Sequence, residues 1–542
     1  MTQKNQRPVW ISSIILASGL LLNGCGSTES TGTWTDTVEI SAGSGNRLPK
    51  TAVNSTSRLA IWEKVTYTTT ADTATNNLHT DPGTGDHVNL SFQTLPDQLE
   101  HTHYITTAHT SVWAALGNPR SSSNVTDWKE PVKLAQGQTR NLSTKAIAKD
   151  DGDHLWADTL SKTEFTQAQI GIDSSNRGLA IWVMRDSNEQ PAIYASRYDG
   201  SNWGSSSIIS NTTKSVRNPR LAMETSGNAI AIWEQMNETC QCFTLVARLF
   251  KPNAGGWEAS SSITLLSDDG TGTPNSKPAT VTNAQVAYSS NGIGMVSWNQ
   301  LEPDASPATA AARTIYAHPL LISGWTGTPV AVSSTTALAE NMSLSMNNNG
   351  EAILAWEQWD SIAVPAQKSV YAASYSSGAW AAAALTHPGQ ATLDTREVTT
   401  ALDDNSNAYV AWTIQDTSGG LTNKWNNADS QLWMATNSSG AWVASLQISN
   451  ERFAIHKPQL MAMATPTLIL TWREWSIPTS KSAYSVYGRV IDSSDNSSSA
   501  TELLGTASSD EQGSLQMSAS DKHLNLVWSE NENSIQSVEF RR

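Results

Sequence analysis

Eight copies of a short apolar motif ending in tryptophan constrain the fold of this chain more than any other feature. From the second copy onward, successive motif tryptophans are 51 to 65 residues apart, and the first two are separated by one repeat plus an insertion. Self-similarity at such a period is the signature of a repeat architecture. The copies are RLAIW (58–62), GLAIW (178–182), AIAIW (229–233), GMVSW (294–298), AILAW (352–356), AYVAW (408–412), LILTW (468–472) and LNLVW (524–528).

Each repeat contains four strand-like pieces. In the second repeat they are residues 168–175, 178–185, 192–198 and 203–210. The pieces are rich in β-branched and aromatic residues and are separated by Ser, Asn, Gly and Asp, which favour turns. Four antiparallel strands at this period are typical of a propeller blade. The sequence therefore predicts an all-β chain folded as an eight-bladed β-propeller of four-stranded antiparallel blades.

The two ends of the repeat region predict that the ring is closed. The last repeat has three strand-like pieces, 514–520, 524–528 and 534–540, and residues 33–41 match the missing fourth piece. We expect this N-terminal strand to complete the last blade, which would remove an unpaired sheet edge. The motif tryptophans and those that open the fourth strands are expected to pack between blades, because large aromatic side chains stabilise sheet-on-sheet contacts.

The N-terminus predicts export. Lys4 and Arg7 precede an apolar stretch at 9–22, which is too short to span a membrane and has the length of a signal sequence. Leu22-Asn23-Gly24-Cys25 resembles the lipobox of bacterial lipoproteins, and the resemblance implies cleavage after residue 24 and lipidation of Cys25. Residues 25–32 would be a lipidated tether and 33–542 the propeller. Gly26 and Ser27 favour the outer membrane of the cell envelope, and the alternative is an ordinary cleaved signal with a chance cysteine.

The charge distribution limits the kinds of partner that the protein is expected to bind. The net charge is −15, and the acidic residues are spread along the chain. This pattern argues against a nucleic acid or an anionic membrane surface as partner. We expect a monomer that is attached to the membrane through its lipid anchor and that engages a protein or a glycan.

One face of the predicted propeller carries the long connections. The insertions at about 63–103 and 134–167 belong to it, and variable loops on a rigid scaffold are common binding sites. The residues directly after the motif tryptophans enter this face and could form a polar mouth, unless they are simply solvated strand ends. Two tryptophans outside the repeat positions could be exposed platforms or could pack within loops. The predicted ligand-binding residues are Glu63, Glu234, Asn299, Glu357, Trp359, Arg473 and Trp475.

Histidines and cysteines supply further candidates. His101, His103 and His109 could bind Zn²⁺ or Cu²⁺. Their loose spacing favours an exposed polar loop over a metal site, and no other cofactor is expected. Cys240 and Cys242 could form a disulfide in an oxidising compartment, although a bridge between residues so close in sequence is strained.

The repeat resembles the propeller repeats of secreted bacterial proteins of the sialidase-like kind. The nearest match to the sialidase Asp-box runs from Ser174 to Trp182, with Asn in place of Asp and one extra residue before the tryptophan. Sialidases have six blades, an arginine triad and a tyrosine nucleophile. No motif here corresponds to those groups, so the resemblance implies the fold and no catalytic residue.

Three functions follow from this sequence. The first, which we favour, is a binding or scaffold module that uses the long-loop face. The second is a carbohydrate-active enzyme, which would need a pair of carboxylates in the mouth at about 5–10 Å. The third is a lectin with repeated pockets between blades, which would need polar residues that recur from blade to blade.

Overall fold

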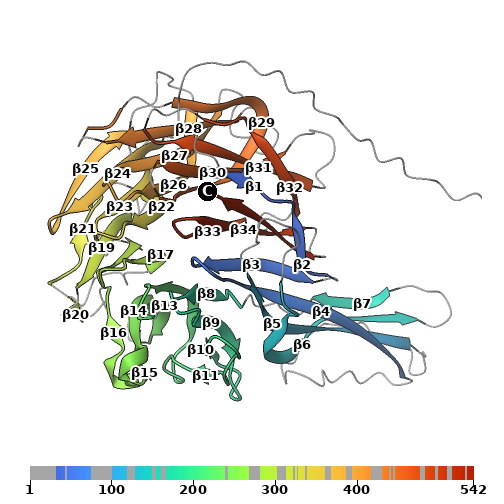
Figure 1. Ribbon diagram of the computed structural model, residues 1–542. Coiled ribbons are helices and arrows are strands. Elements are labelled where there is room, and N and C mark those ends of the chain that lie inside the picture. The colour runs from blue at the N-terminus through green and yellow to red at the C-terminus, as the bar shows by residue number, and fades with distance from the viewer. Residues whose placement is uncertain are drawn as a thin grey trace, which may run out of the picture.

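Eight antiparallel blades surround a central axis in the computed structural model (Figure 1). The predicted all-β, eight-bladed propeller is therefore confirmed. The structure describes residues 32–42, 45–74, 101–118, 128–148, 154–159, 166–238, 242–267, 281–301, 313–321, 324–325, 327–335, 338–359, 368–385, 393–416, 430–438, 441–443, 446–464, 466–475, 483–494, 498–508, 515–530 and 534–542.

The first four blades follow each other along the chain, with the first strand of each innermost. Blade 1 contains β3 (Asn46–Val53), β4 (Arg58–Ala74), β5 (His101–Gly117), β6 (Val132–Ala148) and β7 (His154–Thr159). Blade 2 contains β8 (Gln169–Ile172), β9 (Gly178–Arg185), β10 (Pro191–Tyr198) and β11 (Ser207–Ile208). Blade 3 contains β12 (Val216–Met223), β13 (Ala229–Asn237), β14 (Cys242–Lys251), β15 (Gly256–Trp257) and β16 (Thr264–Leu265), with two short 3-10 helices, η1 (Pro252–Ala254) and η2 (Ser260–Ser262). Blade 4 contains β17 (Val281–Tyr288), β18 (Gly294–Leu301), β19 (Arg313–Leu321), β20 (Gly324–Trp325) and β21 (Val330–Ala331).

The other four blades complete the ring. Blade 5 contains β22 (Ala339–Met346), β23 (Ala352–Trp359), β24 (Lys368–Ser376) and β25 (Ala379–Leu385). Blade 6 contains β26 (Leu393–Leu402), β27 (Ala408–Asp416), β28 (Ser430–Asn437) and the first part of β29 (Leu446–Ala462), which continues as the inner strand of blade 7. Blade 7 also contains β30 (Thr467–Trp475), β31 (Ala483–Asp492) and β32 (Glu502–Ser508). Blade 8 contains β33 (Gln516–Ala519), β34 (His523–Glu530), β35 (Ser534–Arg541), β1 (Thr33–Trp34) and β2 (Val38–Ser41).

The N-terminal strand closes the ring as the sequence predicts. β1 and β2 both pair antiparallel with β35, and Trp34 lies opposite Phe540 in the ladder. Their rings meet edge to face with centroids 5.2 Å apart. On the other side of blade 8, Val53 N donates to Ser518 Oγ of β33 at 3.2 Å. The two ends of the chain therefore share the sheet of blade 8, and the inner strands of the first and last blades are in direct contact.

The core lies between the blades. All eight motif tryptophans are at most 1% exposed. Trp182 of blade 2 packs with Leu59 and Ile61 of blade 1. Four of the motif tryptophans stack on a tyrosine of the third strand, as Trp356 does on Tyr371. The predicted packing of these residues between blades is confirmed. The tryptophans of the fourth strands differ, because they are half-buried and cover aromatic residues of their own blades, such as Tyr198 beneath Trp203.

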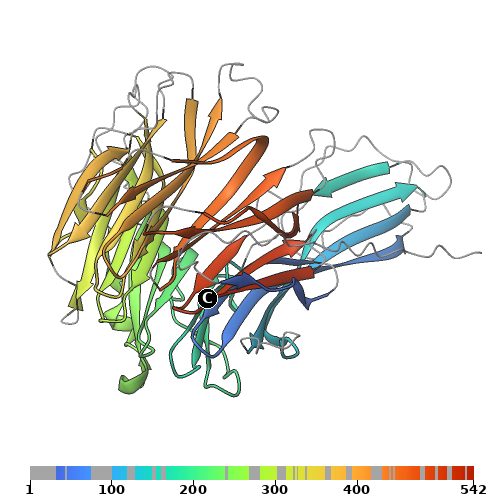
Figure 2. The ribbon, with the colours of Figure 1, turned by 45° about the horizontal axis from the view of Figure 1, so that its top comes forward.

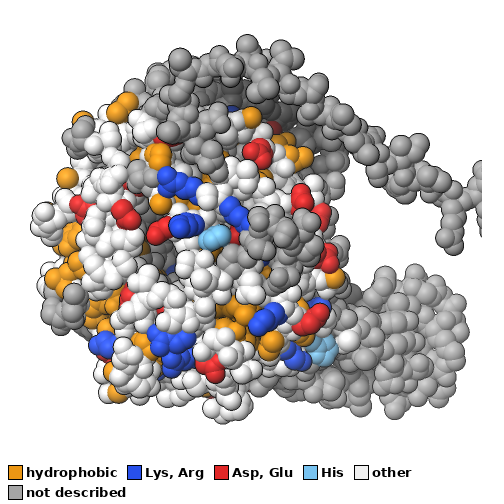
Figure 3. Space-filling model, viewed as in Figure 1, with side chains coloured by type: hydrophobic (Ala, Val, Ile, Leu, Met, Phe, Trp, Pro, Cys, Tyr) orange, Lys and Arg blue, Asp and Glu red, His pale blue; other side chains and the backbone are white. Residues whose placement is uncertain are grey.

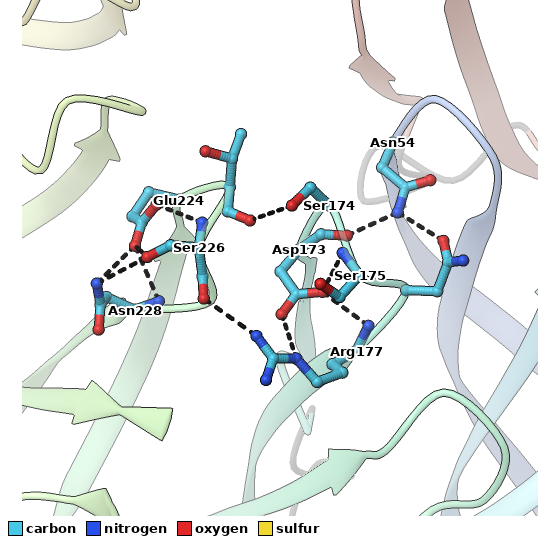
Figure 4. A network of polar contacts seen from close by, with 10 residues as sticks. Asn54, Asp173, Ser174, Ser175, Arg177, Glu224, Ser226 and Asn228 are labelled. Atoms are coloured by element: carbon cyan, nitrogen blue, oxygen red, sulfur yellow. Dashed lines mark hydrogen bonds and ion pairs between the residues drawn. The ribbon is translucent and has the colours of Figure 1, made fainter. Parts of the chain in front are cut away.

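The turns between first and second strands join neighbouring blades on one face of the ring. Asp173 accepts hydrogen bonds from the backbone of its own turn, and its carbonyl accepts one from Asn54 of blade 1 at 2.6 Å. Ser174 and Arg177 donate to backbone carbonyls of the blade 3 turn, at 2.8 and 3.1 Å (Figure 4). These bonds fix three blades to each other at the face opposite the long connections.

Blade 1 extends far beyond the ring. β4 and β5 each have 17 residues and pair from Arg58↔Gly117 to Ala74↔His101. β3 pairs with β4 only as far as Lys64, so the outer part of β4 has no strand on that side among the described residues. β6 and β7 continue the sheet on the other side, and the four strands project outward together (Figures 1 and 2). Much of the predicted insertion thus consists of extensions of the strands of blade 1. Residues 75–100 lie outside the described part.

Candidate functional site

The mouth of the central channel, where the inner strands begin, is the candidate site. Seven blades have a residue with positive φ at or just before the start of the inner strand, and in six of them the ladder shifts register there, which is a β-bulge. At each bulge, the inner-strand residue just before the register shift lies opposite the residue that follows the motif tryptophan in the second strand. The positive-φ residues are Leu48, Gln167, Asn218, Asn283, Asn341, Glu397 and Lys457.

Two of the predicted mouth carboxylates are closed into ion pairs within their own blade. Glu63 is 1% exposed and bonds the Arg47 Nε at 2.5 Å. Glu234 is fully buried, bonds the Arg217 Nε at 2.7 Å and accepts from Asn218 Nδ2 at 3.0 Å. Burying a carboxylate is costly unless it is paired in this way. These two side chains are therefore part of the scaffold.

Glu357 is the most constrained of the predicted residues. Lys368 Nζ lies 3.1 Å from Glu357 and 3.0 Å from Glu340, the residue opposite Glu357 in the ladder. Burial raises the pKa of Glu357, and Lys368 and Asn341 oppose that shift by charge and hydrogen bonding. Two carboxylates do meet here, but one lysine holds both. Both oxygens of Glu357 are bonded, Oε1 to Asn341 and the Glu397 backbone and Oε2 to Lys368.

The residues after the motif tryptophan also join neighbouring blades. Glu63 accepts from the backbone N–H of Thr166 in blade 2, and Glu357 accepts from Glu397 N in blade 6 at 2.7 Å. Asn299 Nδ2 donates to Ala339 O in blade 5 at 2.9 Å. The same position in blade 8, Ser529, donates to Asn46 O in blade 1 at 2.8 Å. Four of the eight blade junctions thus use this one sequence position, and any contact of these residues with a ligand stays a prediction.

Blade 7 presents a cationic variant of the same arrangement. Arg473 is 2% exposed and lies over the Tyr484 ring, with its guanidinium carbon 4.3 Å from the ring centroid. His456, opposite Arg473 in the ladder, approaches Glu397 of blade 6 at 3.6 Å. Burial would raise the pKa of Glu397, but His456 and Lys457 outweigh it and lower that pKa. This stretch of the rim is the more exposed one, since Lys457 is open to solvent.

The two tryptophans predicted as platforms lie at the ends of second strands. Trp359 ends β23, is half-buried, and has Lys368 Nζ 4.9 Å from its ring centroid. A lysine already occupies the position over that ring. Trp475 ends β30, and its side chain lies outside the described part. Their roles as platforms for a ligand stay predictions.

The histidines and cysteines are placed only in part. His101, His103 and His109 all lie on β5, and the side chains of the first two are outside the described part. His109 Nε2 is 2.9 Å from the Thr68 hydroxyl. Among the described residues, no group of three His, Cys, Asp or Glu side chains is arranged to hold a metal ion. Cys242 is buried at the start of β14 and disulfide-bonded. Cys240 and Cys25 lie outside the described residues, so the Cys240–Cys242 bridge and lipidation stay predictions.

Sequence reasoning missed a ring of polar residues one step below the mouth. In each blade, the residue directly before the motif tryptophan pairs with a residue of the inner strand, and that inner-strand residue is polar. Two of them are cations, and a repeated signal marked them: Arg47-Leu48-Pro49-Lys50 and Arg217-Asn218-Pro219-Arg220 share the pattern Arg-x-Pro-Lys/Arg. The ring residues are Lys50, Gln169, Arg220, Gln285, Ser343, Thr399, Gln459 and Gln516.

A second charged cluster lies on the opposite face, at the end of blade 8. Glu539 bonds Arg58 of blade 1 at 2.7 Å, His523 at 3.1 Å and Arg541 at 3.3 Å. Burial would raise the pKa of Glu539, but these three partners outweigh it and lower the pKa to about 2. Basic side chains gather near the middle of this face (Figure 3), close to the C-terminus marked in Figure 1. The Glu539 cluster fixes blade 8 to blade 1 and leaves the mouth untouched.

No protein family model matches this sequence, and no curated protein matches it either. Similar solved structures include an ulvan lyase, with 12% identity and a TM-score of 0.43 over 72% of this chain and 90% of that one. They also include a Hadza microbial sialidase, with 10% identity and a TM-score of 0.37 over 82% and 77% of the two chains. A protein of unknown function from Dyadobacter fermentans has 9% identity and a TM-score of 0.37 over 61% and 96%. The expected fold-level likeness to the sialidase-like propellers is present, and it concerns the fold alone.

Among the described residues, no helix is long and apolar enough to cross a membrane.

Proposed function

We propose that this chain is an exported lipoprotein, anchored through Cys25 in the outer membrane, whose propeller binds a partner at the face that carries the blade 1 extension. The lipobox-like sequence Leu22–Cys25 supports the anchor. The observation that carries the binding role is the extension itself. Four strands leave the ring together, and β7 pairs with β6 alone among the described strands.

The geometry of the extension favours a protein partner. A strand that pairs on one side only presents a row of free backbone donors and acceptors. An extended segment of another protein can add to such an edge as a further strand. The outer part of β4 and all of β7 offer two such edges. Because these edges lie outside the ring, a partner can use them without disturbing the blades.

The charge pairing in the mouth argues against hydrolysis. A glycosidase needs two carboxyl groups with distinct protonation states on either side of its substrate. Here Glu63 and Glu234 are paired with arginines, and Lys368 holds Glu340 and Glu357 together. The lectin alternative is also weakened, because the positions that recur from blade to blade join the blades to each other.

A combined glycan-array and hydrolysis screen on the full mature chain tests this proposal, with and without added Zn²⁺ or Ca²⁺. We expect no turnover of any glycoside. Turnover that is lost in Glu357→Gln would overturn the binding proposal in favour of the enzyme. Glycan binding that is lost in Trp359→Ala would replace the protein partner with a glycan.

A further inference from the structure

The outer part of the blade 1 extension brings three residues of metal-ligand type to one place in the ladder. β4 and β5 pair there without a register shift, and Asp72 lies directly opposite His103. His101 lies two positions from His103 on β5. Directly opposite residues, and residues two apart on one strand, lie on the same face of a sheet. The strand pairing therefore adds a carboxylate to the two histidines, and all three residues share one face.

The spacing of these three positions suits a single small cation. Directly opposite residues of an antiparallel pair have their Cα atoms about 4.5–5.5 Å apart, and residues two apart on a strand are separated by about 6.7 Å. Imidazole and carboxylate groups carried at such spacings can reach one ion at the usual Zn–N and Zn–O distances of about 2.0–2.2 Å. Both groups are ligands that Zn²⁺ takes from proteins.

The other positions that flank the two histidines on β4 and β6 all carry alanine. Ala74 and Ala148 lie opposite His101, and Ala146 lies opposite His103. A methyl side chain neither competes for a cation nor has the length to occupy the space beside it. The flanking positions therefore leave room for an ion and a bound water.

His109 shares this face of the sheet but is too far along the strand to join the other two histidines. It lies six residues beyond His103, which is about 20 Å on an extended strand. Its Nε2 is 2.9 Å from the Thr68 hydroxyl. The three histidines that the sequence suggests as one metal site are therefore divided, and Asp72 takes the place of His109.

We propose that Asp72, His101 and His103 bind Zn²⁺ between β4 and β5, with water in the fourth position of a tetrahedral site. Three protein ligands and one open position are a common arrangement for this ion. The ion would join β4 to β5 at the base of the connection formed by residues 75–100, and a clip that closes a long loop stabilises the folded state. The site lies between two paired strands rather than at the free edges, so it goes beyond the partner-binding role proposed for the extension.

The strand itself supplies matched variants for a test. His101→Ala and His103→Ala each remove one imidazole, and Asp72→Asn removes the carboxylate charge at nearly constant volume. Thr102→Ala changes the residue between the two histidines, which belongs to the other face of the sheet by the alternation of a strand. His109→Ala removes a histidine of the same strand and the same face outside the site. These last two variants are the controls.

Calorimetric titration of the full mature chain with zinc chloride, after treatment with a chelator and its removal, measures the binding directly. We expect one saturable site whose affinity falls by about tenfold or more in each of the three ligand variants, since even the loss of an outer-shell partner of a metal ligand costs this much. Thr102→Ala and His109→Ala should bind as the wild type does. The affinity should also fall as the pH is lowered through the titration of histidine, because protons compete with the metal for the imidazoles.

Titration with cobalt chloride gives a second readout, because the visible absorption of bound Co²⁺ reports its coordination geometry. We expect the intense bands of a tetrahedral site in the wild type and in both controls, and their loss in the ligand variants. Absence of saturable Zn²⁺ binding by the wild type, or equal affinities of the ligand variants and the controls, would overturn the proposal. Neither result depends on whether a protein binds the extension.

Discussion

Arg47 donates to Glu63 across the first two strands of blade 1 at 2.5 Å, and both side chains are almost completely removed from solvent. The same carboxylate accepts the backbone N–H of Thr166 at the start of blade 2. One side chain thus satisfies a cation of its own blade and a backbone donor of the next. Glu63, directly after a motif tryptophan, therefore helps to hold neighbouring blades together.

Replacing Glu63 by Gln tests that role. The change leaves the Arg47 guanidinium buried beside a neutral group, and breaking a buried pair by removing one partner typically costs about 3–5 kcal/mol. We expect a clear fall in Tm by scanning calorimetry. Glu258→Gln is the control, because its pair with Lys251 is exposed and such pairs contribute roughly 0–1 kcal/mol. Equal effects of the two substitutions would contradict the structural role of Glu63.

Removing residues 26–41 tests closure of the ring. The deletion takes away β1 and β2, so β35 loses its outer partner and Phe540 loses the edge of the Trp34 ring. We expect a lower Tm and concentration-dependent aggregation, because an unpaired edge strand recruits other chains. Size-exclusion chromatography with light scattering measures both. Deleting residues 26–31 alone should leave the protein monomeric and as stable as the wild type, and aggregation of that shorter deletion would contradict this explanation.

The Glu539 cluster makes stability depend on acid pH. Its pKa in the folded chain is about 2, against 4.5 for an unperturbed glutamate, so the unfolded state binds more protons between these values. The stabilisation is therefore complete above about pH 4.5 and is lost as the pH falls toward 2. In Glu539→Gln we expect a lower Tm at neutral pH and a flatter decline in acid. Glu130→Gln, at an exposed position, should follow the wild-type profile, and a parallel decline in Glu539→Gln would refute the assignment.

Lys50 produces a dependence of the same sign at alkaline pH. Burial and the charge of Arg220 lower its pKa from 10.5 to about 7, with Glu234 as the acid that acts on Arg220. The unfolded state binds more protons between pH 7 and 10.5, so this group makes the folded state more stable as the pH rises through that range. The Tm difference between the wild type and Lys50→Gln, followed from pH 6 to 10, should change in favour of the wild type. A constant difference would show that the ammonium is not perturbed.

The architecture could be predicted because it depends on patterns along one strand. The motif tryptophans, the turn residues and the match of residues 33–41 to a fourth strand all report local features, and the structure confirms what they imply. The fourth strands were predicted less well. The predicted strand at 203–210 reduces to β11 (Ser207–Ile208) and a single bridge between Tyr198 and Trp203, because its serines and glycine favour turns.

The environment of the mouth residues could not be predicted, because it depends on the register in which the inner strand pairs with the second strand. The bulge between Arg47 and Lys50 inserts one extra residue into the inner strand and thereby brings Arg47 opposite Glu63. Without that shift, the spacing of Arg47 and Glu63 in the sequence carries no sign of contact. The pattern Arg-x-Pro-Lys/Arg in blades 1 and 3 was visible in the sequence, but only the strand pairing shows that Lys50 and Arg220 occupy the same position of their inner strands.

Site-specific photo-crosslinking in the native envelope tests the central claim, that a protein partner binds at the blade 1 extension. A photoreactive residue replaces Asp158 on β7 in one variant and exposed Ser201 in another. Ser201 lies in the turn after β10, beside the turns between first and second strands on the opposite face. We predict a discrete protein adduct from position 158 and none from position 201. Adducts from position 201 alone, or from neither position, would contradict the claim.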